Sequence, residues 1–163
     1  MGSRSSSLAI CAAAAALLGS CRAASPAACT TCSVVAGHYS ETAESATVDC
    51  GDNHFLGFSG TSDAASLAQT NSALSLRSSF GAMPGVLHDD GSATFGPIPA
   101  VAHAVDGTGT VDPSGKPTPG KLSLEGFFLP LGSAAAASSF AGTYVFVADD
   151  DGCELDSRAT WHR

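Results

Sequence analysis

The sequence predicts an all-β fold, an antiparallel meander of about eight to ten short strands that is closed as a barrel or stacked as a sandwich. The 163 residues include 18 glycines and only 13% charged residues, whereas surface helices need Glu, Lys and Arg. Aromatic and β-branched residues occur in short runs separated by Gly, Asp, Asn and Pro. The spacing lacks the long crossovers of βαβ units, so we expect antiparallel neighbours.

Strand-like runs and turn signals alternate along residues 34–163, which we expect to form one domain. The first strand-like runs are residues 34–48 and 54–58. Two hairpins follow, each with a polar turn between two runs: 66–70 with 73–80 across Asn71-Ser72, and 86–88 with 93–95 across residues 89–92.

A loop of Pro and Gly, residues 112–120, separates strand-like residues 101–111 from 121–129 and can be neither helix nor central strand. Gly107-Thr108-Gly109 lacks the third glycine and the helix of a nucleotide-binding loop, and we interpret it as a bulged strand. Residues 132–139 are rich in Ala but too short to persist as an isolated helix, so we expect a loop or a single turn.

The C-terminal hairpin has the clearest pattern of all. Residues 142–148 meet residues 153–163 across Asp149-Asp150-Asp151-Gly152. In the last strand the side chains alternate, and one face carries Cys153, Leu155, Ser157, Ala159 and Trp161. A period of two places that face in a core and the other in water.

The formal net charge is −8, which limits the partners of the chain. Neutralising phosphates requires clustered Lys and Arg, so we expect no nucleic acid and no electrostatic adhesion to anionic lipid. Solubility explains the acidity. Any attachment to a membrane is then expected to be covalent or to use the N-terminal segment.

Residues 1–20 have the features of a signal peptide. Arg4 supplies a positive charge in a short polar start, residues 8–18 form an uninterrupted apolar run of eleven, and small residues follow. A spanning helix requires roughly 20 apolar residues. We therefore expect export, followed by a tether at residues 21–33 made largely of small residues.

The residues Leu18-Gly19-Ser20-Cys21 resemble the lipobox of bacterial lipoproteins, which consists of an aliphatic residue, two small residues and a cysteine. The resemblance implies cleavage between Ser20 and Cys21, with diacylglycerol and a further acyl chain such as palmitate on Cys21. Several acyl chains anchor a protein stably where one does not. The resemblance thus implies a lipid-anchored protein of the cell envelope, and the Arg22 that follows implies the outer membrane if the source is Gram-negative.

Two alternatives for the N-terminus stay open. One is ordinary secretion, with cleavage near Ala23-Ala24 or Ala27-Ala28 and loss of Cys21. The other is N-myristoylation of Gly2, for which Ser6 fits the loose pattern.

Four cysteines remain after Cys11 is removed with the signal peptide and Cys21 is assigned to lipid: Cys29, Cys32, Cys50 and Cys153. An even number in an oxidising compartment favours disulfides. We favour Cys50–Cys153, because each lies beside a turn at a strand end, and a local Cys29–Cys32 loop. The same CxxC could instead be a redox pair or half a zinc site, but no βαβ pattern precedes it and no second pair of ligands has zinc spacing.

No catalytic, cofactor or metal site is predicted. The five histidines are isolated, at positions 38, 54, 88, 103 and 162. The run Asp149-Asp150-Asp151-Gly152 lacks the alternating ligands of a calcium loop, and we interpret it as a solvated turn. No GxSxG motif of a serine hydrolase occurs.

The last strands, with Gly142-Thr143-Tyr144 followed by Thr160-Trp161, resemble in texture the lipocalin-like or avidin-like barrels of small exported lipoproteins. This resemblance implies no ligand residues. The aromatic residues either fill such a barrel or line a cavity: Phe55, Phe58, Phe127, Phe128, Tyr144, Phe146 and Trp161. We predict a membrane-tethered, non-enzymatic structural or protein-interaction domain. The alternatives are a barrel that binds a small apolar ligand and, less favoured, a secreted enzyme.

Overall fold

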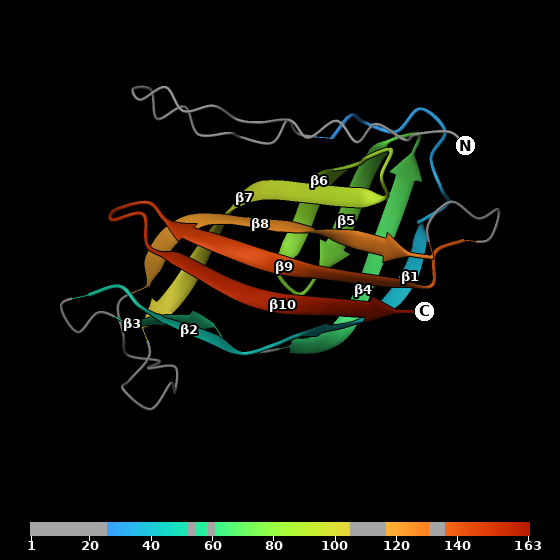
Figure 1. The fold of residues 1–163 in the computed structure, drawn as a ribbon. Helices are drawn as coiled ribbons and strands as arrows, with labels where there is room; N and C mark the ends of the chain where they lie inside the picture. The colour runs from blue at the N-terminus through green and yellow to red at the C-terminus, as the bar shows by residue number, and fades with distance from the viewer. Residues whose placement is uncertain (1–25, 52–54, 59–60, 105–116, 131–135) are drawn as a thin grey trace, which may run out of the picture.

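The fold is all-β, as a computed structural model shows (Figure 1). The model describes residues 26–51, 55–58, 61–104, 117–130 and 136–163. The described residues form no helix and the following strands: β1 Gly37–Ala43, β2 Ala46–Asp49, β3 Phe55–Phe58, β4 Thr61–Thr70, β5 Ala73–Ser78, β6 Gly81–Leu87, β7 Ser92–Ala104, β8 Thr118–Leu129, β9 Ser139–Ala148 and β10 Glu154–His162. The prediction of an all-β fold is therefore confirmed.

Eight of these strands close into an antiparallel barrel, which decides between the barrel and the sandwich left open by the sequence. The order around the barrel is β1, β4, β5, β6, β7, β8, β9 and β10. Closure depends on β1 pairing with β10 and on β7 pairing with β8. The remaining strands, β2 and β3, form a ribbon that joins the last residues of β7 through Leu56 and Ala104.

The barrel has two different ends, because consecutive strands run in opposite directions. At the N-terminal end lie residues 26–36, the β4–β5 and β6–β7 turns, and Arg163. At the far end lie the β5–β6 and β9–β10 turns and the β2–β3 ribbon (Figure 1). We use these two names below.

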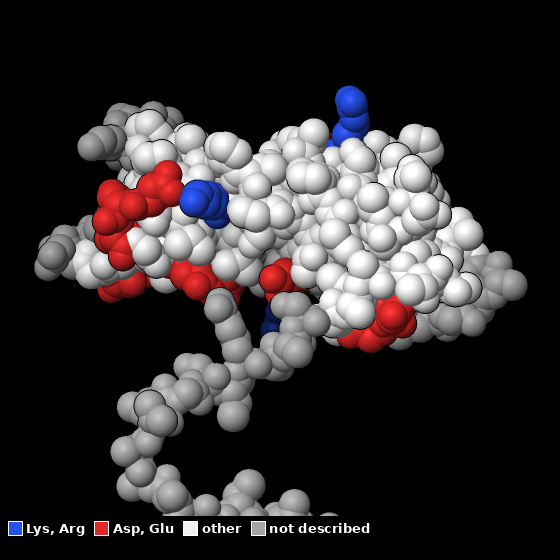
Figure 2. Space-filling model, turned by 90° about the horizontal axis from the view of Figure 1, so that it is seen from above, with Lys and Arg blue, Asp and Glu red and all other residues white. Residues whose placement is uncertain are grey.

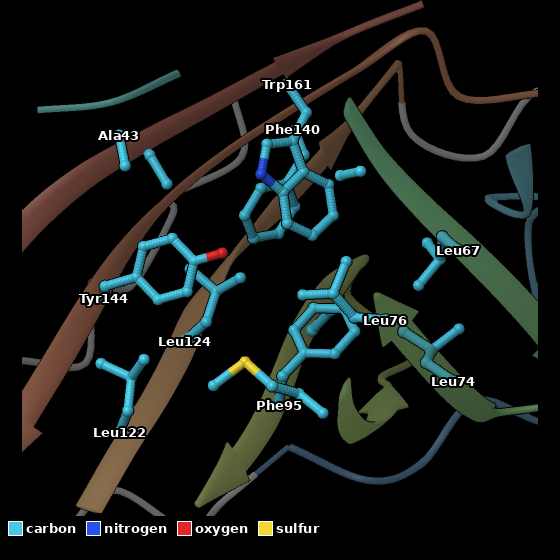
Figure 3. Packing of buried hydrophobic residues seen from close by; sticks show 14 of the residues in the cluster. Ala43, Leu67, Leu74, Leu76, Phe95, Leu122, Leu124, Phe140, Tyr144 and Trp161 are labelled. Carbon is cyan, nitrogen blue, oxygen red and sulfur yellow. The ribbon is translucent and has the colours of Figure 1, made fainter. Parts of the chain in front are cut away.

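Aromatic side chains fill the interior of the barrel (Figure 3). The rings of Phe140 and Trp161 stack with their centroids 4.3 Å apart, and Phe128 packs on Phe140 at 4.9 Å. Each of the following rings is at most 2% exposed: Tyr39, Phe95, Phe128, Phe140, Tyr144 and Trp161. The predicted alternation of β10 is confirmed, since Leu155, Ser157, Ala159 and Trp161 are buried and the residues between them are exposed.

Glycines that face the interior make room for these rings. A Cβ atom on Gly126 would lie 2.5 Å from Cζ of Phe140, and one on Gly142 would lie 2.6 Å from Cε1 of the same ring. Both distances are too short for a real contact, so the ring of Phe140 covers two neighbouring glycines. Laying a large ring flat on a glycine is one way in which a small, strongly curved sheet fills its interior.

Several predicted boundaries differ from the observed strands. The run 34–48 forms two strands, β1 and β2, instead of one. The Glu44 N–H still donates to the Arg158 carbonyl on β10, and the chain then leaves the barrel to form β2. Residues 93–95 and 101–104, expected in two separate strands, belong to one strand, β7, which has an irregular register between Phe95 and Ile98, and residues 105–111 lie outside the described residues. The predictions for 107–109 and 132–135 lie outside the described residues, and Ser139 already belongs to β9.

Candidate functional site

Two disulfides join the four cysteines in the favoured pairs. Cys50 is joined to Cys153 with 5.7 Å between the Cα atoms, and Cys29 to Cys32 with 5.3 Å. The Cys50–Cys153 bridge connects the end of β2 to the residue before β10, so it fastens the β2–β3 ribbon across the far end of the barrel. Among the described residues no three His, Cys, Asp or Glu side chains gather as a metal site.

The CxxC segment belongs to the barrel rather than to a free spacer. Cys29 is only 7% exposed, and its N–H donates to the Leu87 carbonyl at 3.0 Å. Ala28 forms a β-bridge with His88. The side chain of Gln69 donates to the Ser33 carbonyl and accepts from the Val35 N–H, both at 2.9 Å. The folded part of the chain therefore begins earlier than residue 34, the boundary expected from the small-residue composition.

A cleft of about 330 Å³ opens at the N-terminal end, between this segment and the barrel. Val35, Leu87 and Phe128 supply its apolar lining, and the Cys29–Cys32 disulfide lies at its edge. Its volume is near the lower limit of small-molecule sites, about 300–1,000 Å³. The cleft is thus large enough for a small ligand, and it lies at the mouth of the barrel, where it borders the core rings at Phe128.

The polar groups of the cleft come mainly from the β6–β7 turn. Nε2 of His88 lies 3.3 Å from the Thr94 hydroxyl, while its buried Nδ1 has no hydrogen-bond partner within the described part of the chain. Oδ1 of Asp89 accepts from the Thr30 N–H at 2.9 Å. These groups can orient a polar atom of a ligand.

A buried carboxyl lies inside the barrel. Glu41 is fully buried, and its Oε1 accepts hydrogen bonds from the Tyr144 hydroxyl at 2.5 Å and from the Trp161 Nε1–H at 3.2 Å. Its Oε2 has no partner among the residues that the structure describes. Burial raises the pKa of Glu41, although the two hydrogen bonds lower it, and burial likewise raises the pKa of Tyr144. Both donors to this carboxyl are themselves buried core side chains, so we assign it to the architecture of the core.

The sequence did not single out Glu41, although a signal for it exists. Tyr39, Glu41 and Ala43 share a period of two in β1, and all three are buried. A glutamate in phase with apolar residues on a strand marks an inward-facing carboxyl. Residue type alone points the other way, because Glu is rarely fully buried unless it is paired.

The remaining candidate residues are separated or serve as turns. The described histidines do not gather as ligands. The β9–β10 turn is exposed and is held by its own side chains, since Oδ1 of Asp151 accepts from the Cys153 N–H at 2.8 Å. Phe128, Tyr144, Phe146 and Trp161 belong to the core, whereas Phe127 is 51% exposed and lies on the outer surface of the barrel. The side chains of Phe55 and Phe58 lie outside the described residues.

Ser20 and Cys21, between which cleavage is expected, and with them the lipid attachment expected at Cys21, also lie outside the described part of the chain. Within the described part, no helix has the length and hydrophobicity needed to cross a bilayer. The chain matches no protein-family model, no curated protein and no solved structure.

Proposed function

We propose that this chain is an exported, lipid-anchored protein whose barrel is a non-enzymatic structural or protein-interaction domain. The filled interior is the observation that carries the proposal. Seven rings that are at most 2% exposed, the six named above and Phe146, occupy the space that a ligand-binding barrel leaves empty. A barrel filled in this way offers partners its outer wall and its two ends.

The anchor is supported by the sequence before the barrel. An apolar run of eleven residues ends at Leu18, and Gly19-Ser20-Cys21 completes the pattern of a lipobox. The two disulfides support an oxidising compartment, because such bonds persist after export and are rare in the cytosol. Both features agree with a protein of the cell envelope.

Substitution of Cys21 tests the anchor. We expect the wild type, expressed with its own N-terminus in a bacterial host, to sediment with membranes and to need detergent for release. Cys21→Ser should remove the acyl chains and shift the protein to the soluble fraction. Cys11→Ser is the matched control, because it changes a cysteine within the expected signal peptide and should leave the membrane fraction unchanged. Membrane retention of Cys21→Ser would contradict the anchor.

The cleft at the N-terminal end favours a second candidate, the binding of a small apolar ligand. The cleft has an apolar lining and a volume of about 330 Å³. An environment-sensitive apolar fluorophore should then bind saturably, and Ser33→Trp, at a residue that lines the cleft, should abolish the binding. Val34→Trp is the control, because Val34 is 55% exposed and is not part of the lining. Absence of saturable binding, or equal binding by both variants, would count against this candidate.

A further inference from the structure

We propose that the N-terminal end of the barrel faces the lipid surface, with Val34, Phe127 and Leu129 in contact with the headgroup region of a zwitterionic membrane. This orientation rests on the lipid anchor at Cys21 proposed above. It adds a defined interaction surface and places the far end of the barrel away from the bilayer.

The length of the tether restricts the distance between the barrel and the membrane. Residues 22–25 separate the lipid-bearing position, Cys21, from Pro26, the first residue that the structure describes. Five fully extended steps span at most about 18 Å. Three residues after Pro26, Cys29 is fixed to Leu87 at the N-terminal end. This end therefore stays within a short distance of the acyl chains, whatever path the tether takes.

Exposed apolar side chains gather at the same end. Val34, Phe127 and Leu129 are 55%, 51% and 48% exposed. Backbone hydrogen bonds connect Val34 and Leu129 through two consecutive residues: the Ala137 N–H donates to the Val34 carbonyl, and the Ser138 N–H donates to the Leu129 carbonyl, each at 2.9 Å. Phe127 precedes Leu129 by two residues on the outer face of β8. Exposed apolar groups grouped beside a lipid attachment point suit the interface between headgroups and acyl chains.

The distribution of charge agrees with this orientation and selects the kind of lipid. Exposed carboxylates of Asp149, Asp150, Asp151 and Glu154 lie at the far end, and in Figure 2 most of the visible acidic surface is on the side where Figure 1 shows the β9–β10 turn. The N-terminal end also carries exposed carboxylates, Asp89 and Asp90. Arg163 at that end is engaged with the carbonyls of Val35 and Ala36 and with the Tyr39 ring. Anionic lipid would therefore repel this end, whereas a zwitterionic surface would not.

Quenching by brominated lipid tests the orientation. The processed, full-length protein is reconstituted into phosphatidylcholine vesicles whose acyl chains carry bromine, and attachment is read separately by flotation. Phe127→Trp places a reporter on the proposed contact surface. Val101→Trp is the matched control, because Val101 is 54% exposed and pairs with Pro119 toward the far end of the barrel. The emission of Trp161, the single native tryptophan, is subtracted with the wild type.

We expect Phe127→Trp to lose most of its added emission to bromine and Val101→Trp to keep its own. Addition of anionic phosphatidylglycerol should reduce the quenching of Phe127→Trp. Equal quenching of the two variants, or an unquenched Phe127→Trp on protein that floats with the vesicles, would overturn the orientation and leave the anchor intact. Protein that fails to float and has an unmodified N-terminus would overturn the anchor and the orientation with it.

Discussion

Replacing Glu41 by Gln and by Leu separates the two contributions of this carboxyl to the core. Its Oε1 accepts hydrogen bonds from Tyr144 and Trp161, and its Oε2 is buried with no partner in the described part of the chain. Gln keeps an acceptor oxygen and carries no charge. Leu keeps neither the acceptor nor the charge.

The expected cost of Glu41→Leu follows from the two donors that lose their acceptor. The Trp161 Nε1–H would lose Glu41, its hydrogen-bond acceptor among the described residues. The Tyr144 hydroxyl would retain only a long contact of 3.5 Å to the Ser78 hydroxyl. Each buried donor left unsatisfied costs about 1–3 kcal/mol, so the free energy of unfolding should fall by about 2–6 kcal/mol in acid. Glu41→Gln should change it little under the same conditions.

The pH dependence of Glu41→Gln has a definite sign. Burial raises the pKa of Glu41 above its value of 4.5 in the unfolded chain, and the negative charge of Asp63 on β4 raises it further, against the hydrogen bonds from Tyr144 and Trp161. The folded protein therefore holds this proton to higher pH than the unfolded chain does. The resulting stabilisation is complete below the unfolded value and is lost as the pH rises through the folded pKa. Glu41→Gln has no carboxyl to titrate and does not lose this stabilisation. The free energy of unfolding of the variant minus that of the wild type should therefore increase with pH.

Urea unfolding followed by tryptophan emission measures this difference from about pH 4 to pH 8. Trp161 is the only tryptophan of the chain and is fully buried, so its emission reports the loss of the core. The other carboxyls titrate in both proteins, and their effects cancel when the two free energies are subtracted. A difference between Glu41→Gln and wild type that stays constant or decreases with pH would refute the assignment of a raised pKa.

Three further changes probe the barrel. Trp161→Ala should lower the free energy of unfolding by about 3–5 kcal/mol, whereas Phe127→Ala at an exposed position should lower it by less than about 1 kcal/mol; equal effects would mean that the faces are misassigned. Replacing Cys50 and Cys153 together by Ser opens a loop of 103 residues and should cost about 2–5 kcal/mol in chemical denaturation, and an unchanged midpoint would show that the bridge is dispensable. Gly126→Ala should cost about 1–3 kcal/mol in thermal melting, because its Cβ would lie 2.3 Å from the Ala141 carbonyl oxygen and 2.5 Å from Cζ of Phe140, and an unaltered melting temperature would contradict that packing.

The sequence predicts most of this fold where local chemistry decides the structure. In β10 the alternation of side chains is unbroken, and its buried face is the predicted one. Asn71 adopts a positive φ of 55° at the turn between β4 and β5, as an Asn in a tight hairpin allows. The favoured Cys50–Cys153 pair also lies at two strand ends that the structure brings together, and Cys29–Cys32 closes the predicted local loop.

Long-range pairing could not be predicted in the same way. Closure of the barrel depends on strands far apart in the chain, such as β1 and β10, and no local pattern distinguishes it from a sandwich. Gly96, Pro97 and Pro99 resemble a turn in composition, yet they lie inside β7, where the register shifts. Because these residue types are typical of turns, the sequence predicts two strands where the structure has the single strand β7.

The site was less predictable, because it depends on docking and burial. The small residues before Val34 have the composition of a linker, and only their hydrogen bonds to Leu87 and Gln69 create the cleft. Glutamate as a residue type favours the surface, whereas the position of Glu41 in the alternation of β1 places its side chain inside the barrel. In both cases tertiary contacts overrode the local preference of the residues.

Intact mass spectrometry of the mature N-terminus most directly tests the proposal of a lipid-anchored barrel. We expect the processed protein to begin at Cys21, to carry the added mass of diacylglycerol and an acyl chain, and to contain no free thiol. An unmodified N-terminus near Ala24 or Ala28, or a full-length product that keeps Met1 and reduced cysteines, would contradict the proposed anchor.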